Sequence, residues 1–208
     1  MDNNKKVIIT VGRQFGSGGK EVANALGKKL GITVYDNELI THAAENSGFS
    51  KDLFVRSDEK RSFFSFSNFF AYGRYGGGDT AENYVDDNTL FRIQSDTIRD
   101  IASKGSAIFV GRCSDYILRD MDNKLDVFIS APEQERIKRI ATRRNISEDQ
   151  AKSLISKQER TRETYYNYFT FGNWGVASNY DLCVDSSILG IDGTVDLIIY
   201  VAKAKGLL

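Results

Sequence analysis

Cysteine, histidine and proline are nearly absent from this chain, which has two, one and one of them in 208 residues. Two cysteines without a CxxC spacing exclude a disulfide framework and a cysteine-rich zinc site. Cys183 lies within a predicted strand and is expected in the core. The single histidine excludes a multi-histidine metal site.

Long apolar runs are also missing. None approaches the roughly 20 residues of a membrane span, and the opening residues MDNNKK contain no apolar leader segment. Lys plus Arg and Asp plus Glu both total 28, so the chain has no broad basic field for nucleic acid, although a local basic site stays open. We therefore expect a cytoplasmic protein that binds neither membranes nor nucleic acids.

Apolar, β-rich runs alternate with segments of helical periodicity along the whole chain. Strands are predicted at residues 6–11, 32–35, 106–110, 125–131 and 180–186. Helices are predicted at residues 21–30, 37–47, 86–103, 114–119, 132–144, 147 to about 165, and 191–204. Strands that alternate with helices form parallel sheets covered on both faces. Residues 1–208 are thus expected to form one α/β domain around a five-stranded parallel sheet.

A glycine-rich turn, GRQFGSGGK, lies between the first strand and the first helix. In that position, successive backbone N–H groups and a helix N-terminus face one point and form an anion site. We predict that the turn binds the phosphates of a nucleotide. The residues predicted to bind them are Arg13, Gly16, Ser17, Gly18, Gly19, Lys20 and Glu21.

The register of this turn against the phosphate-binding pattern G-x-x-x-x-G-K-[ST] is ambiguous. Counting back from Lys20, the first glycine of the pattern falls on Gln14. Aligning the G-S-G of the turn instead puts that first glycine on Arg13 and the lysine on Gly19. Either way, Glu21 stands close to where a hydroxyl ligand of Mg²⁺ is expected.

Three stretches of the sequence together resemble the cytidylate-kinase-like family of P-loop proteins. They are GRQFGSGGKEVANALGKKLGITVYDNELI, GSAIFVGRCSDYIL and ERTRETYYNYFTFGNWGVASNYDLCVDSS. The resemblance implies a three-layer sandwich with a helical lid at about 136–175 and an arm at about 37–85 that binds a nucleoside monophosphate. It also implies transfer of the γ-phosphoryl group of ATP to CMP or dCMP, with Mg²⁺ as the expected metal ion.

Carried over residue by residue, the resemblance implies roles for a set of charged side chains. The predicted catalytic residues are Lys20, Arg112, Arg160 and Arg162. The predicted acceptor-binding residues are Asp36, Arg112 and Asp115, and ATP is expected to bind Arg136 and Arg139 as well as the turn. Arginine suits the task because its planar fork grips two phosphate oxygens, and phosphoryl transfer needs aligned positive charge.

The positions of Arg160, Arg162 and Asp36 bear on their roles. Arg160 and Arg162 are two residues apart, so they point to different sides of an ideal helix unless a helix end or a loop intervenes. Asp36 is a site residue, the N-cap of the helix that follows it, or both.

Three questions stay open at the level of the sequence. The candidate Mg²⁺ ligands are Asp96, Asp115, Asp126 and Asp185. The aromatic segment 62–75 forms either a wall of the acceptor site or a contact in a homodimer. The chain is a nucleotide kinase, a nucleotide-binding regulator without efficient turnover, or a kinase of a non-nucleotide metabolite.

Overall fold

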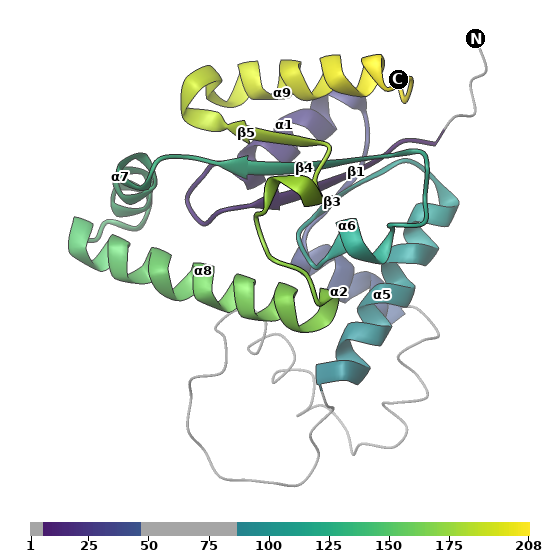
Figure 1. The fold of residues 1–208 in the computed structure, drawn as a ribbon, viewed down its shortest axis with the longest axis horizontal. Helices are drawn as coiled ribbons and strands as arrows, with labels where there is room; N and C mark the ends of the chain where they lie inside the picture. The colour runs from purple at the N-terminus through teal and green to yellow at the C-terminus, as the bar shows by residue number, and fades with distance from the viewer. Residues whose placement is uncertain (1–5, 47–86) are drawn as a thin grey trace, which may run out of the picture.

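The structure, a computed structural model, describes residues 6–46 and 87–208 (Figure 1). Its sheet consists of β1 (Ile8–Arg13), β2 (Val34–Tyr35), β3 (Ala107–Val110), β4 (Lys124–Ser130) and β5 (Leu182–Asp185). The strand order is β2-β3-β1-β4-β5, and neighbouring strands run parallel. This confirms the predicted five-stranded parallel sheet.

Helices cover both faces of the sheet and complete three layers (Figure 1). The helices are α1 (Gly19–Leu30), α2 (Asn37–Asn46), α5 (Asp87–Lys104), α6 (Ser114–Ile117), α7 (Glu133–Arg144), α8 (Glu148–Thr170), the 3₁₀ turn η1 (Ala177–Asn179) and α9 (Ser186–Ala204). One face packs against α1 and α9, and the other packs against α2, α5, α6 and the end of α8. The α/β class and the layered architecture are confirmed.

The alternation of side chains along β1 builds both cores. Ile9 and Val11 pack with α1 and α9, whereas Ile8 packs with the helices of the opposite face. Such alternation follows from the two-residue period of a strand. Because both faces are buried, residues Ile8–Val11 are buried throughout and only Thr10 among them is polar.

Three element boundaries differ from the prediction, each for a local reason. β1 continues to Arg13, which pairs in register with Ile129 of β4, so the turn starts two residues later than expected. α8 continues to Thr170, because Tyr166 and Thr170 at its end are buried. The closing helix already starts at Ser186 and contains a kink at Gly190.

The expectation that Cys183 lies in the core is wrong. Cys183 is exposed because β5 is an edge strand of the sheet. Within residues 6–46 and 87–208, no helix has the length and apolar character that crossing a membrane requires. Most of the predicted arm at 37–85, and all of the aromatic segment 62–75, lie outside the described residues.

Candidate active site

The glycine-rich turn lies at the carboxyl end of β1, the edge where open α/β sheets bind ligands. Gly16 and Gly18 both have left-handed backbones, with φ of 82° and 81°, and α1 starts directly afterwards. Ser17 is fully buried between them, and its Oγ donates to the carbonyl of Gln14 at 3.0 Å. Ser186 Oγ in turn donates to the carbonyl of Ser17 at 2.5 Å. The turn is therefore held in a fixed shape at the N-terminus of a helix, where anions bind.

Three arginines converge beside the turn, and we call them the arginine group: Arg13, Arg112 and Arg162. Arg13 ends β1, Arg112 follows β3 with a left-handed φ of 61°, and Arg162 comes from α8. Arg162 Nη1 donates to the carbonyl oxygen of Arg13 at 3.0 Å. The parallel sheet thus brings two strand ends together, and α8 adds a third guanidinium from outside.

The electrostatics of the arginine group mark a positively charged site. Burial, followed by repulsion from Arg162 and Arg112, holds the pKa of Arg13 well below its usual value. Burial also lowers the pKa of Arg112, and it lowers that of Arg162 to about 10. A depressed arginine pKa means that the surroundings disfavour a further positive charge. An anion bound between these groups would relieve that repulsion.

Asp36 at the end of β2 caps α2 and also pairs with the lysine of the turn. Its Oδ1 accepts from the N–H groups of Glu38 and Leu39 at 3.1 and 3.2 Å, so it caps α2. Its Oδ2 pairs with Lys20 Nζ at 2.8 Å. Burial opposes ionisation of Asp36, but the bonds from Lys20 and the backbone outweigh it and lower its pKa. The lysine of the turn is therefore held towards β2 by a carboxylate.

Arg136 and Arg139 of α7 both fasten the turn. Arg136 is buried, with Nε donating to the carbonyl of Ala131 at 3.0 Å and Nη1 paired with Glu159 Oε2 at 3.0 Å. Glu159 Oε1 also accepts from the N–H of Phe15 at 3.2 Å. Arg139 Nη1 donates to the carbonyl of Gly16 at 2.6 Å. The sequence predicted nucleotide contacts for both arginines, and the structure shows them supporting the turn.

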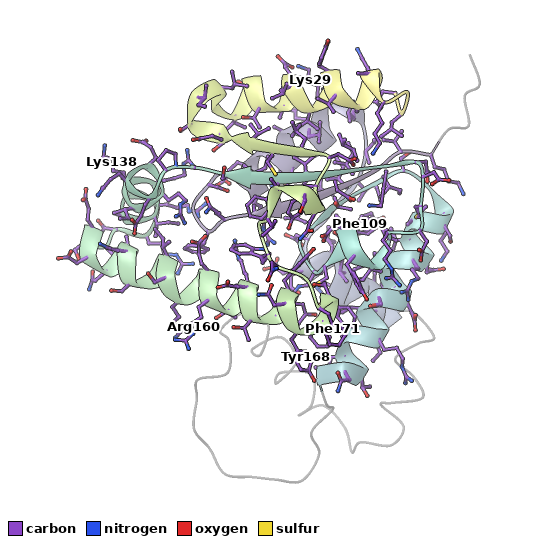
Figure 2. The ribbon with its side chains drawn as sticks, in the orientation of Figure 1. Lys29, Phe109, Lys138, Arg160, Tyr168 and Phe171 are labelled. Atoms are coloured by element: carbon purple, nitrogen blue, oxygen red, sulfur yellow. The ribbon has the colours of Figure 1, made fainter. Side chains whose placement is uncertain are left out.

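Two predicted residues do not join the arginine group. Arg160 is exposed and points away from the sheet on the outer side of α8 (Figure 2), whereas Arg162 faces the turn. The helical periodicity of α8 thus separates them, as their spacing predicts. Asp115 accepts a hydrogen bond from Tyr166 Oη at 2.7 Å. Burial raises its pKa despite that bond.

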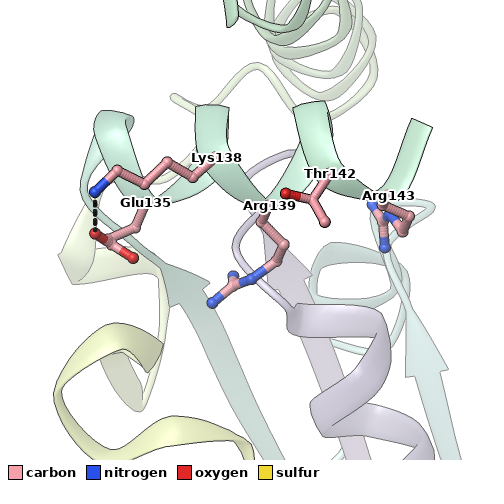
Figure 3. Close-up of a pocket in the computed structure, with 5 residues that line it drawn as sticks. All are labelled: Glu135, Lys138, Arg139, Thr142 and Arg143. Carbon is pink, nitrogen blue, oxygen red and sulfur yellow. Dashed lines mark ion pairs between the residues drawn. The ribbon is translucent and has the colours of Figure 1, made fainter. Parts of the chain in front are cut away.

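A pocket of about 470 Å³ runs along α7 next to the turn (Figure 3). Its lining residues are Glu135, Lys138, Arg139, Thr142 and Arg143. Figure 3 shows Arg139 pointing from α7 towards the start of α1, while Lys138 and Glu135 pair at 3.6 Å at the other end. Glu21 of α1 pairs with Arg143 at 2.6 Å. Arg139 therefore borders both the turn and the pocket.

The candidate Mg²⁺ ligands are engaged elsewhere. Asp96 pairs with Arg99, and Asp185 accepts from the N–H of Ser187 as the N-cap of α9. Asp126 accepts from Thr10 Oγ1 at 2.7 Å and pairs with Lys124. No group of three metal-ligating side chains occurs in the described part of the chain.

Three further residues support the site. Glu159 bridges Arg136 and the backbone of Phe15. The Phe15 ring lies 5.3 Å from the guanidinium of Arg162, and the Tyr165 ring lies 5.8 Å from that of Arg112. Flat aromatic faces hold guanidinium groups in place. The E-x-x-R spacing of Glu159 and Arg162 was the available signal, because residues three apart share one helix face.

A sequence model of the cytidylate kinase-like family matches residues 8–188. A cytidylate kinase from Sulfolobus acidocaldarius is 30% identical over 117 residues, which are 56% of this chain and 63% of that protein. One from Methanothrix thermoacetophila is 27% identical over 198 residues, covering 95% of this chain and 99% of that protein.

Among solved structures, an uncharacterized protein from Eubacterium ventriosum superposes with a TM-score of 0.70 and 26% identity, covering 95% of this chain and 99% of that chain. A shikimate kinase from Bacteroides thetaiotaomicron shares the fold, with a TM-score of 0.51 and 12% identity, covering 95% of this chain and 98% of that chain.

Proposed function

The chain belongs to the cytidylate kinase-like family, and we propose that it is an ATP-dependent phosphotransferase that acts on CMP, dCMP or a similar small acceptor. The observation that supports this most directly is the arginine group beside the rigid glycine turn. Its positive charge is only partly balanced by Asp36 and Glu159. That arrangement suits a reaction in which negative charge spreads over a transferred phosphoryl group.

The proposal assigns the donor to the turn. The phosphates of ATP lie against Gly16, Ser17, Gly18 and Gly19, and the rest of the nucleotide lies along the α7 pocket. Arg139 supports this placement because it contacts Gly16 and lines the pocket. Mg²⁺ would enter as its complex with ATP and would supply positive charge to the phosphates. Such a complex needs few protein ligands for the metal.

The acceptor is assigned to the side of the turn that faces β2 and β3. Asp36 and Arg112 lie at the ends of these strands. Arg112 is suited to the acceptor phosphate and Asp36 to a hydroxyl group or to orienting a cation. Arg162 lies between donor and acceptor and is proposed to hold the transferred group. These residues perform no covalent chemistry, so catalysis would consist of alignment and charge stabilisation.

The lid predicted at 136–175 stays a prediction. Both of its helices contact the turn, because Arg139 of α7 donates to the carbonyl of Gly16 and Glu159 of α8 accepts from the N–H of Phe15. Hydrogen exchange should therefore slow in both helices when ATP and acceptor are present. Protection confined to residues 12–25 would contradict the lid.

A coupled assay of ADP release tests the proposed function. CMP, dCMP and the other nucleoside monophosphates are supplied one at a time with ATP and Mg²⁺, and turnover is expected with a cytidine acceptor. Arg162→Ala should lower kcat/KM by about 100-fold or more, because an arginine on the transferred group is worth at least that much. Arg160→Ala, two residues away on α8, should have an effect at least tenfold smaller.

Contrary outcomes of this assay point to two different functions. ATP binding without acceptor-dependent ADP release would instead support a nucleotide-binding regulator, which the departures from the pattern at Gln14 and Glu21 favour. Turnover with a metabolite extract, but with no nucleoside monophosphate, would support a kinase of another small acceptor.

A further inference from the structure

The backbone of the turn resolves its register. Gly18 is the last left-handed residue before α1, which starts at Gly19. In the pattern G-x-x-x-x-G-K, the second glycine closes the turn and the lysine follows at the start of the helix. With Gly18 as the second glycine, the first glycine belongs at position 13 and the lysine at position 19. This chain has Arg13 and Gly19 there, so the cation and the glycine have exchanged places.

The two exchanged residues are in direct contact. A Cβ atom built on Gly19 would lie 2.5 Å from Cβ and 3.0 Å from Cγ of Arg13. A Cβ on Gly111, at the end of β3, would lie 2.0 Å from Arg13 Nη1. The Arg13 side chain therefore passes over Gly19 and reaches Gly111. Its stem fills the space that a side chain at position 19 would need.

Lys20, the lysine one position further on, is differently placed. Its ammonium group pairs with Asp36, and that hydrogen bond raises its pKa. The guanidinium of Arg13, in contrast, has no hydrogen-bond or ion-pair partner within residues 6–46 and 87–208. Of the two cations, Arg13 is the one left to meet an anion.

We propose that Arg13 takes the place of the phosphate-binding lysine and contacts the β- and γ-phosphate oxygens of the donor. The cation is thus delivered from the end of β1 rather than from the first turn of α1. A guanidinium can bind two phosphate oxygens at once, whereas an ammonium acts as a point charge. This role rests on the proposed function, because it assumes a triphosphate donor at the turn.

The exchange can be reversed by mutation. Arg13→Met keeps most of the stem and removes the charge. Arg13→Gly with Gly19→Lys restores the usual order of the pattern and removes the clash at position 19. Gly19→Lys alone should destabilise the fold, because the Arg13 stem already fills that space. Arg99→Ala, at an exposed arginine of α5, is the control.

Calorimetry with ATP and with inorganic triphosphate measures the effect without requiring turnover. Arg13→Met should weaken both affinities by about 10- to 100-fold, the loss expected for hydrogen bonds to a charged group. The double variant Arg13→Gly/Gly19→Lys should regain most of that loss, which a merely structural role of Arg13 would not allow. Lys20→Ala should cost less than Arg13→Met, and Arg99→Ala should leave both affinities unchanged.

Each contrary result has a distinct meaning. If folded Arg13→Met binds triphosphate as well as the unchanged protein does, the role of Arg13 is overturned while the proposed function stands. A larger loss for Lys20→Ala than for Arg13→Met, or a folded double variant that regains nothing, overturns it too. If the unchanged protein binds neither ATP nor triphosphate, the proposed function itself fails.

Discussion

Replacing Arg136 by methionine should destabilise the protein strongly, because this buried cation joins three segments. It bonds to the carbonyl of Ala131, pairs with Glu159 of α8 and lies 3.5 Å from the carbonyl oxygen of Phe15. Methionine keeps much of the volume but leaves the Glu159 carboxylate without its cation. Breaking a buried ion pair in this way costs about 3–5 kcal/mol.

The surroundings of Glu159 favour a cost near the low end of the range given for a broken buried ion pair. The side chain of Glu159 remains 22% exposed, and its Oε1 keeps the hydrogen bond from Phe15. We therefore expect a loss of about 3 kcal/mol in the free energy of unfolding. For a chain of this size, that loss corresponds to a fall in Tm of about 6–12 °C.

Chemical denaturation of four variants isolates the ion pair. Lys138→Met on the exposed side of the same helix should change the stability by less than about 0.5 kcal/mol. Adding Glu159→Gln to Arg136→Met should restore about 1–2 kcal/mol, because it removes the orphaned charge, and Glu159→Gln alone completes the cycle. If Arg136→Met is no less stable than Lys138→Met, the ion pair between Arg136 and Glu159 does not hold the turn and α8 together.

The remaining predictions concern a helix cap, the thiols and one buried acid. Ser147→Ala should cost about 1 kcal/mol in chemical denaturation, because the side chain caps α8 in a complete capping box; Ser153→Ala, on an exposed face of the same helix, should cost nothing. Iodoacetamide should label the exposed Cys183 at least tenfold faster than Cys113, whose pKa is raised by burial, and equal rates would contradict the packing around Cys113. Burial raises the folded pKa of Asp115, so the fold binds a proton that the unfolded chain releases above about pH 4. The wild type therefore loses stability relative to Asp115→Asn as pH rises from 4 to the folded pKa, and a difference that is independent of pH would refute this.

The sheet could be predicted because its signal is local. Runs such as KVIITV and SAIFV are apolar at nearly every position, which is the pattern of strands buried on both faces. The order of the strands is not local information, and the exposure of Cys183 depends on it. In a central strand, a cysteine within a short apolar run would be buried in the core. Cys183 lies in β5, which is an edge strand, and its side chain is exposed.

The burial of Arg136 has a signal in the sequence, although its partner does not. Arg136 lies four residues before Ile140 and next to Ile137, so it belongs to the apolar stripe of α7. An arginine within such a stripe is buried and needs a partner. Its partner Glu159 is on the next helix, and only the packing of α7 against α8 brings the two together.

The glycine turn shows how a failed pattern match can still be informative. A missing lysine at position 19, read alone, favours loss of catalysis, and the adjacent Lys20 then looks like a substitute shifted by one residue. Two facts oppose that interpretation: α1 starts at Gly19, and the Arg13 stem occupies the space above it. The side chain of Arg13 fits only because position 19, at the start of α1, has no side chain. Gly111 likewise leaves space for the guanidinium of Arg13. A turn that had lost phosphate binding would not need glycine at both position 19 and position 111. The two glycines therefore favour the interpretation that Arg13 supplies the phosphate-binding cation in place of a lysine at position 19.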